Sequence, residues 1–237
     1  MANIALLIAG GSGNRMHQDI PKQFLTVNER PVIVYTLEAF EKHPAIDAIS
    51  VVCLEGWENV LSAYAKQFNI TKLRHIIKGG STGMESIRNG VFELEKHYNA
   101  DDIVLIHDAI RPMLSSEIIS DCIRVTQKYG NATAVIPCAE AMLQTEDGKS
   151  ASGSYPRDKL KRTQTPLSFR LGLICNLHRR AIEAGITNSV ASCTLMAELG
   201  ETVYFSAGSE KNIKLTTVED IDIFKALLKT ERASWLK

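Results

Sequence analysis

The stretch from Ile4 to Lys22 constrains the fold more than any other part of the chain. A short apolar run, Ile4–Ile8, leads into three glycines at positions 10–13. A buried strand that ends in a glycine-rich loop is typical of parallel α/β sheets, where such loops contact ligands. Arg15 and Lys22 follow, and two cations beside free backbone N–H groups can neutralise a polyphosphate. The stretch therefore predicts a triphosphate-binding loop.

This loop matches neither of two familiar phosphate-binding motifs. Gly13 is followed by Asn14 and Arg15 rather than by the Lys-Ser/Thr pair of a Walker A loop. The dinucleotide fingerprint requires a third glycine where this chain has Met16. What remains is a glycine-rich loop with cations and no hydroxyl of its own for Mg²⁺. That combination favours displacement at an α-phosphate, where cations stabilise the developing charge, over hydrolysis at a γ-phosphate.

Strand-like apolar runs alternate with segments of helical period along almost the whole chain. We expect strands at residues 4–8, 46–54, 73–78, 102–106, 132–138 and 203–206. We expect helices at residues 31–40, 57–68, 115–129, 170–184, 192–199 and 218–229, and one more after residue 83. Such alternation is typical of a parallel sheet with helices on both faces. The pattern predicts a three-layer, Rossmann-like α/β fold in a single domain, residues 1–237, with a mostly parallel sheet.

Composition excludes several classes of partner. The 237 residues, 45% of them hydrophobic, suffice for a sizeable core. Lys+Arg and Asp+Glu both number 27, so no net charge draws the chain to nucleic acid or to an anionic membrane. No apolar run approaches the roughly 18 residues of a membrane span. The five cysteines are scattered without metal-binding spacing, which is typical of reduced thiols. We expect a cytoplasmic protein.

A second glycine-rich loop spans residues 79–83 and precedes a helix that carries Ser86. It could be only a tight strand-to-helix turn. However, the carboxyl ends of parallel strands meet at one edge of the sheet, so two glycine-rich loops there favour a bound nucleotide.

Asp108 follows the apolar run 102–106. A carboxylate at the end of a central strand, opposite a phosphate loop, is where one protein oxygen and substrate phosphates would hold Mg²⁺. A helix N-cap or a salt bridge to Arg111 is the alternative for Asp108. We expect the neighbouring His107 to be structural, because phosphoryl-type transfer does not require a histidine.

Residues 139–163 interrupt the alternation. They contain glycines, a proline, small polar residues and a cationic end at Arg157, Lys159, Lys161 and Arg162. A segment of this length without a clear helix is unusual in a compact domain and is commonly a functional arm or lid. We expect a protruding β-arm; a solvated charged loop is the alternative.

The motifs of this chain together resemble a known family, the cytidylyltransferases that act on 2-C-methyl-D-erythritol 4-phosphate or D-ribitol 5-phosphate. The resemblance runs from about residue 3 to about residue 228, in order and at similar spacing. It rests on Ala9–Met16, Pro21–Phe24, Ser86–Gly90, Ile106–Pro112, Gln164–Pro166 and Asn212–Lys214.

The resemblance implies a nucleotidyltransferase fold and a reaction in which CTP and a polyol phosphate give a CDP-polyol and diphosphate with Mg²⁺. It implies a homodimer joined by the arm. The catalytic cations would be Arg15, Lys22 and Lys214. The nucleotide would contact Ala9, Gly10, Gly11, Ser12, Gly13, Gly79, Gly80 and Ser86. Asp108 would hold the metal, and the acceptor would contact Arg111, Arg157 and Thr165, with Arg157 reaching its own site or that of the neighbouring subunit.

Three departures from the methylerythritol-phosphate pattern fall at Gly83, Ala141 and Val190–Ala191. The family usually carries an Arg at the first position, a Thr at the second and Thr-Asp at the third. Because a site that hydrogen-bonds its substrate discriminates through those groups, their loss predicts a changed acceptor. The opening Ala9-Gly10-Gly11 and Arg162 look more like the ribitol-phosphate branch.

Two further hypotheses stay open at this point. The chain could be a nucleotidyltransferase that uses another base or sugar phosphate. It could also be a non-catalytic nucleotide-binding protein, although such a protein has little reason to keep its phosphate-binding cations.

Overall fold

The computed structural model describes residues 1–11 and 20–234. Their centre is a sheet of seven strands in the order β11-β7-β10-β6-β1-β4-β5. β10 runs antiparallel to β6 and β7, and every other neighbouring pair is parallel. The predicted α/β fold with a mostly parallel sheet is confirmed.

The strands of this sheet are β1 Asn3–Ala9, β4 Ala48–Cys53, β5 Leu73–Lys78, β6 Ile103–Asp108, β7 Asn131–Pro137, β10 Lys161–Arg170 and β11 Phe205–Ala207. Short pairs are formed by β2 Thr26–Val27 with β3 Arg30–Pro31, and by β8 Met142–Gln144 with β9 Gly153–Tyr155. The helices are α1 Val32–Lys42, α2 Glu58–Gln67, α3 Gly83–Glu95, α4 Ser116–Tyr129, α5 Leu171–Glu183, α6 Ser192–Glu198 and α7 Val218–Ser234. Single 3-10 turns lie at η2 Lys22–Phe24 and η3 Arg157–Lys159.

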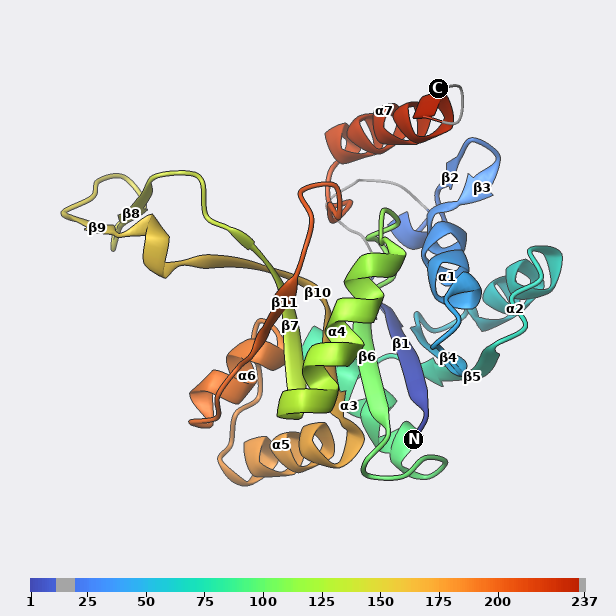
Figure 1. Cartoon of the computed structure of the whole chain (residues 1–237), viewed down its shortest axis with the longest axis horizontal. Coiled ribbons are helices and arrows are strands. Elements are labelled where there is room, and N and C mark those ends of the chain that lie inside the picture. Colours follow the sequence, from blue (N-terminus) through green and yellow to red (C-terminus); the bar gives the residue numbers. More distant parts are fainter. Residues whose placement is uncertain (12–19, 235–237) are drawn as a thin grey trace.

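Both faces of the sheet are covered, because each central strand is apolar on both sides. On β1, Ala5 and Leu7 pack with α1, α2 and α4, whereas Ile4 and Leu6 pack with α3, α5 and α6. Figure 1 shows these two helical layers with the sheet between them. The three-layer prediction therefore holds, and the carboxyl ends of β1, β4 and β6 come together at one edge.

β10 is the element that the sequence did not predict. We expected the arm to extend to residue 163 and a helix to begin at residue 170, but a strand spans Lys161–Arg170 and α5 begins directly after it. Pro166 has no N–H to donate, and the pairing with β7 shifts register between Thr163 and Leu167. A proline in the middle of a central strand hides the strand from pattern-based prediction.

The predicted β-arm is confirmed. β8 and β9 form a small hairpin that projects away from the sheet, at the left of Figure 1. Asp147 closes its tip by accepting hydrogen bonds from the backbone N–H groups of Lys149 and Ser150, each at 2.8 Å. These bonds hold the pKa of Asp147 below its usual value.

Within residues 1–11 and 20–234, no helix is both long and apolar enough to cross a membrane. All five cysteines are free and buried.

Candidate functional site

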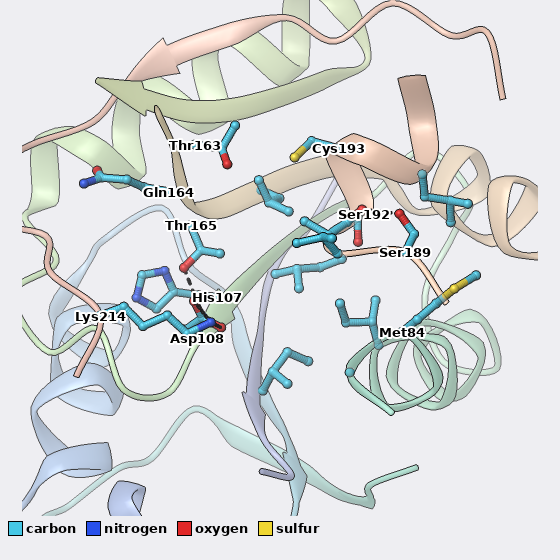
Figure 2. Close-up of a pocket in the computed structure, with 18 of the residues that line it drawn as sticks. Met84, His107, Asp108, Thr163, Gln164, Thr165, Ser189, Ser192, Cys193 and Lys214 are labelled. Carbon is cyan, nitrogen blue, oxygen red and sulfur yellow. Dashed lines mark hydrogen bonds and ion pairs between the residues drawn. The ribbon is translucent and has the colours of Figure 1, made fainter. Parts of the chain in front are cut away.

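Two cavities meet at the carboxyl edge of the sheet. The glycine-loop cavity, about 540 Å³, lies between the end of β1 and the start of α3. The side cavity, about 290 Å³, lies between the ends of β6 and β10 and the loop before α6 (Figure 2). Ile8, Gly83, Asp108 and Lys214 line both cavities. The two spaces therefore share a wall that carries one carboxylate and one ammonium group.

The glycine-loop cavity depends on a close approach of two backbones. A side chain at Gly79 would lie 3.2 Å from the carbonyl oxygen of Cys53 and 3.4 Å from Cα of Gly10. A side chain at Gly80 would collide with Glu85, at 2.3 Å. Because only glycine fits there, the two predicted glycine-rich loops do lie together, and their backbone is exposed to the cavity.

Ser86 and its helix hold the second of these loops. The backbone N–H of Gly80 donates to Oγ of Ser86 at 3.0 Å. Thr82 caps α3 by accepting from the N–H of Glu85 at 3.1 Å, and Glu85 in turn accepts from the N–H of Ser81 at 2.7 Å. The loop is therefore a tight strand-to-helix turn that also forms a cavity wall. Nucleotide binding by this loop stays a prediction.

Gln23 holds the first loop in place, a role that the sequence did not reveal. Its buried side-chain Nε2 donates to the carbonyl oxygens of Ala9 at 2.7 Å and of Gly11 at 3.0 Å. These two bonds fix the chain where it leaves β1 and leave its N–H groups for a ligand. A glutamine beside a glycine-rich loop is the signal that could have indicated this brace.

Lys22 lines the glycine-loop cavity. The structure thus brings this predicted catalytic lysine together with Gly10, Gly11 and Lys214. The remaining predicted loop contacts, Ser12, Gly13 and Arg15, lie outside the described residues.

Asp108 lies between two cations. Nε of Arg111 is 3.0 Å from its Oδ2, and Nζ of Lys214 is 3.2 Å from both Oδ1 and Oδ2. Burial alone would raise the pKa of Asp108, but Lys214 and Arg111 hold it below its usual value. The carboxylate is therefore ionised at neutral pH. The salt bridge to Arg111, which the sequence offered as an alternative to a metal role, is present.

Arg111 and Thr165 are fixed by a network around Asp108. Nη1 of Arg111 donates to the carbonyl oxygen of Asn212 at 2.7 Å, and Nδ2 of Asn212 donates to the carbonyl oxygen of Thr165 at 2.8 Å. The N–H of Asp108 donates to Oγ1 of Thr165 at 3.1 Å. Three of the predicted residues thus meet at one point, joined by the buried Asn212, which the sequence did not assign a role.

His107 is structural, as expected. It is fully buried, lies edge-on to Phe40 and has Nε2 3.2 Å from the carbonyl oxygen of Arg111. Burial lowers its pKa to about 4, so the ring is neutral near pH 7.

A magnesium ion is bound through oxygen ligands, among them one or two carboxylates. In the part of the chain that the structure describes, no three His, Cys, Asp or Glu side chains gather to hold a metal. Among the described residues that line the two cavities, Asp108 is the only carboxylate. One carboxylate beside a phosphate-sized space fits Mg²⁺, which often binds one or two carboxylates together with substrate phosphates. Asp108 as a ligand stays a prediction.

Arg157 and Ala141 lie away from both cavities of their own chain. Arg157 is exposed on the arm, where its Nη1 donates to the carbonyl oxygen of Ala139 at 2.8 Å. Ala141 is also exposed on the arm. The other departures do line the side cavity, with Gly83 at the junction and Val190 and Ala191 at its far wall.

That far wall holds two polar residues that sequence reasoning missed, His178 of α5 and Ser192 at the start of α6. Both are buried, with exposures of 1% and 3%. No motif surrounds either residue, since one stands on an apolar helix face and the other in a serine-rich loop.

Comparison with known proteins agrees with this geometry. The sequence model of the family described as "IspD: 2-C-methyl-D-erythritol 4-phosphate cytidylyltransferase" matches residues 3–230. A ribitol-5-phosphate cytidylyltransferase of Lacticaseibacillus paracasei is 43% identical over 227 residues, 95% of this chain and 97% of the relative. A 2-C-methyl-D-erythritol 4-phosphate cytidylyltransferase of Clostridium botulinum is 36% identical, over 95% and 97%.

A solved structure titled 4-diphosphocytidyl-2C-methyl-D-erythritol synthase has a TM-score of 0.79 at 27% identity and covers 96% of this chain and 98% of its own. The family match spans nearly the whole chain, including both glycine-rich loops and the Asp108 network. The chain therefore belongs to the 2-C-methyl-D-erythritol 4-phosphate cytidylyltransferase family, whose members transfer a cytidylyl group to a polyol phosphate.

Proposed function

We propose that this chain transfers the cytidylyl group of CTP to D-ribitol 5-phosphate and releases diphosphate. The observation that carries the proposal is the wall shared by the two cavities, where Lys214 and Asp108 face both spaces. A triphosphate in the glycine-loop cavity and a polyol phosphate in the side cavity would bring their phosphates together at this wall.

The reaction is a displacement at phosphorus. An oxygen of the acceptor phosphate attacks the α-phosphorus of CTP, a P–O bond forms, and the bond from that phosphorus to the oxygen bridging to the β-phosphorus breaks. The electron pair leaves with diphosphate. The attacking oxygen is already an anion at neutral pH, so no general base is needed, and catalysis rests on positioning and cations.

In this proposal the cationic side chains contact different phosphates. Lys22 and Arg15 neutralise the triphosphate, and Lys214 stabilises charge at the α-phosphate as the fifth oxygen approaches. The backbone of Gly10, Gly11 and Gly80 and the Ser86 hydroxyl surround the nucleoside. Asp108 would hold Mg²⁺, which would supply positive charge to the phosphates when bound.

The acceptor assignment rests on two supports. The ribitol-phosphate relative is 43% identical, against 36% for the methylerythritol-phosphate relative. Val190 and Ala191 replace the Thr-Asp pair that the methylerythritol-phosphate pattern carries, so two polar groups are lost at the acceptor wall. The first feature favours the ribitol branch and the second argues against the methylerythritol acceptor, with 2-C-methyl-D-erythritol 4-phosphate as the second candidate acceptor.

We also propose a cytoplasmic homodimer in which the arms pair. The arm exposes Met142, Leu143 and Tyr155, at 43%, 67% and 54%, on the β8–β9 hairpin. Because exposed apolar groups gathered on a projecting hairpin favour association, a second copy would cover them. The exposed Arg157 of one subunit would then contact the acceptor phosphate of the other.

Mixed dimers test this arrangement. Arg157→Ala and Lys22→Ala proteins, each nearly inactive alone, are unfolded and refolded together. If Arg157 acts across the dimer, one site of each mixed dimer is intact and activity returns. If it acts in its own subunit, both sites of the mixed dimer stay defective and no activity returns.

The function itself is tested by diphosphate release with CTP and Mg²⁺ against D-ribitol 5-phosphate, 2-C-methyl-D-erythritol 4-phosphate, D-arabinitol 5-phosphate and glycerol 3-phosphate. We expect the highest kcat/KM with D-ribitol 5-phosphate. A higher value with the methylerythritol compound would reassign the acceptor. Equal rates with UTP or ATP would contradict a cytidylyl donor, and CTP binding without turnover of any acceptor would indicate a non-catalytic protein.

A further inference from the structure

The side cavity contains polar atoms that have no partner within the described part of the protein. Oγ of Ser192 and both ring nitrogens of His178 are inaccessible to solvent, and none has a hydrogen-bond partner among the described residues. Both side chains line the cavity. A neighbouring serine differs, because Oγ of Ser189 lies 2.8 Å from Oγ1 of Thr194 and is paired.

A buried polar group without a partner can bind a ligand atom where its side chain lines a cavity. Leaving one such group without a partner costs about 1–3 kcal/mol, and most buried polar groups in folded proteins are paired. Here the two side chains that carry the three atoms line the same small space. Burial lowers the pKa of His178 to about 4, so its neutral ring offers one donor and one acceptor near pH 7. A hydroxyl group can satisfy either nitrogen.

The cavity also has a direction. Asp108, Lys214 and Thr165 form one end, and Ser192 and Ser189 lie with Met84 at the other (Figure 2). The phosphate-binding charges are therefore confined to one end. The other end combines the apolar side chains of Met84 and Leu195 with the unpaired polar atoms. A flexible chain with a phosphate at one terminus and hydroxyls at the other matches this division.

Val190 and Ala191 place two apolar side chains on the wall that leads to Ser192. Both line the cavity beside Ser192, and neither can donate or accept a hydrogen bond through its side chain. On this wall, the nearest residue in sequence with a polar side chain and no partner in the described part of the chain is Ser192.

We propose that Ser192 and His178 bind the terminal hydroxyls of the acceptor and select a linear, fully hydroxylated polyol phosphate by its length. This inference rests on the proposed function, because it assumes a polyol phosphate in the side cavity. The two residues determine specificity through direct contact with the distal end of the substrate. The reacting phosphate lies at the opposite end of the cavity.

The test compares a long and a short acceptor. For Ser192→Ala and for His178→Phe, we expect kcat/KM with D-ribitol 5-phosphate to fall about tenfold or more. The reason is that each variant removes a side-chain group that would hydrogen-bond a substrate hydroxyl. With glycerol 3-phosphate, which is too short to reach, wild-type protein and variants should show equal kcat/KM. The KM for CTP should stay unchanged in all of them.

Ser50→Ala is the matched control. Ser50 lies on β4, is fully buried and also has an unpartnered Oγ within the described part of the chain, yet it lines neither cavity. Its kcat/KM should equal that of the wild-type protein with both acceptors. Thermal melting without substrate verifies that each variant folds. If Ser192→Ala does not fold, His178→Phe still tests the inference.

Two outcomes would overturn the inference while the proposed function stands. A loss of equal size with both acceptors would mean that the two residues only support the structure. Unchanged kcat/KM with D-ribitol 5-phosphate would mean that trapped water satisfies them. A wild-type protein that releases no diphosphate with any acceptor would instead refute the proposed function. Assays of wild-type protein and variants with D-ribitol 5-phosphate therefore distinguish failure of the inference from failure of the proposed function.

Discussion

The two halves of the site are built in different ways. The glycine-loop half is formed by backbone, with Gly10 and Gly79 in close approach and Gln23 and Ser86 as braces. The side cavity is formed by side chains from β6, β10, α5 and the loop before α6. A site made of backbone can change little without changing the fold, whereas a wall of side chains changes by substitution. The glycine-loop half, the proposed donor half, is therefore constrained, and the side cavity, the proposed acceptor half, is open to new specificity.

The largest expected effect comes from removing a cation of the proposed donor half. Lys22→Ala should lower kcat/KM by about a hundredfold or more with every acceptor, the scale for one preorganised charge. Diphosphate release measures it, and Lys42→Ala on the exposed side of α1 is the control, expected to match wild-type protein. Undiminished turnover in Lys22→Ala would remove this lysine from the catalytic machinery.

A second change should alter only the acceptor half. The double variant Val190→Thr, Ala191→Asp restores a hydroxyl and a carboxylate at the cavity wall. We expect the ratio of kcat/KM for 2-C-methyl-D-erythritol 4-phosphate over D-ribitol 5-phosphate to rise by about tenfold or more, because such groups discriminate strongly. Competition between the two acceptors measures the ratio. If the KM for CTP shifts as much as the ratio does, the two halves are not independent.

A smaller effect concerns the carboxylate between the halves. The pKa of Asp108 is lowered in the folded state, so its contribution to stability is present above the unfolded pKa and is lost as pH falls through the folded pKa. Asp108→Asn should lose stability less steeply below about pH 4, by at most about 1.4 kcal/mol per pH unit. Denaturant unfolding at several pH values measures the slope. Parallel slopes in the two proteins would contradict the lowered pKa.

The smallest effect falls at the junction. A side-chain carbon added at Gly83 would have no described atom within 4 Å, and the backbone there has no left-handed φ. Gly83→Ala should therefore stabilise the protein by about 0.4–1 kcal/mol. Thermal melting measures the change. Destabilisation would show that the backbone at position 83 requires glycine.

The glycine-loop half could be located from the sequence because its signals are local. Glycines that follow a strand, with a lysine nearby, predict a phosphate loop, and the structure places Gly10, Gly11 and Lys22 around one cavity. The position of Asp108 followed from the same reasoning, since it ends an apolar strand. These predictions needed only periodicity and the rule that parallel strands end at one edge.

The acceptor half could not be predicted in the same way. His178 and Ser192 come from different helices, and only packing brings them to one cavity. Pro166 concealed β10, so the neighbour that carries Thr165 to Asp108 was missed. Asn212 and Gln23 act through hydrogen bonds to distant backbone, which sequence spacing does not reveal.

The place of β10 in the sheet has a consequence for how the chain is synthesised. β6 and β7 follow each other in sequence, with only α4 between them, but β10 separates them in the sheet. Until residue 170 has left the ribosome, the facing edges of both strands have no partner, because the whole arm must emerge before β10 does. Open strand edges invite wrong pairing. Truncation after the arm should therefore give an aggregating chain. The nascent protein remains open to wrong pairing until β10 pairs with β6 and β7.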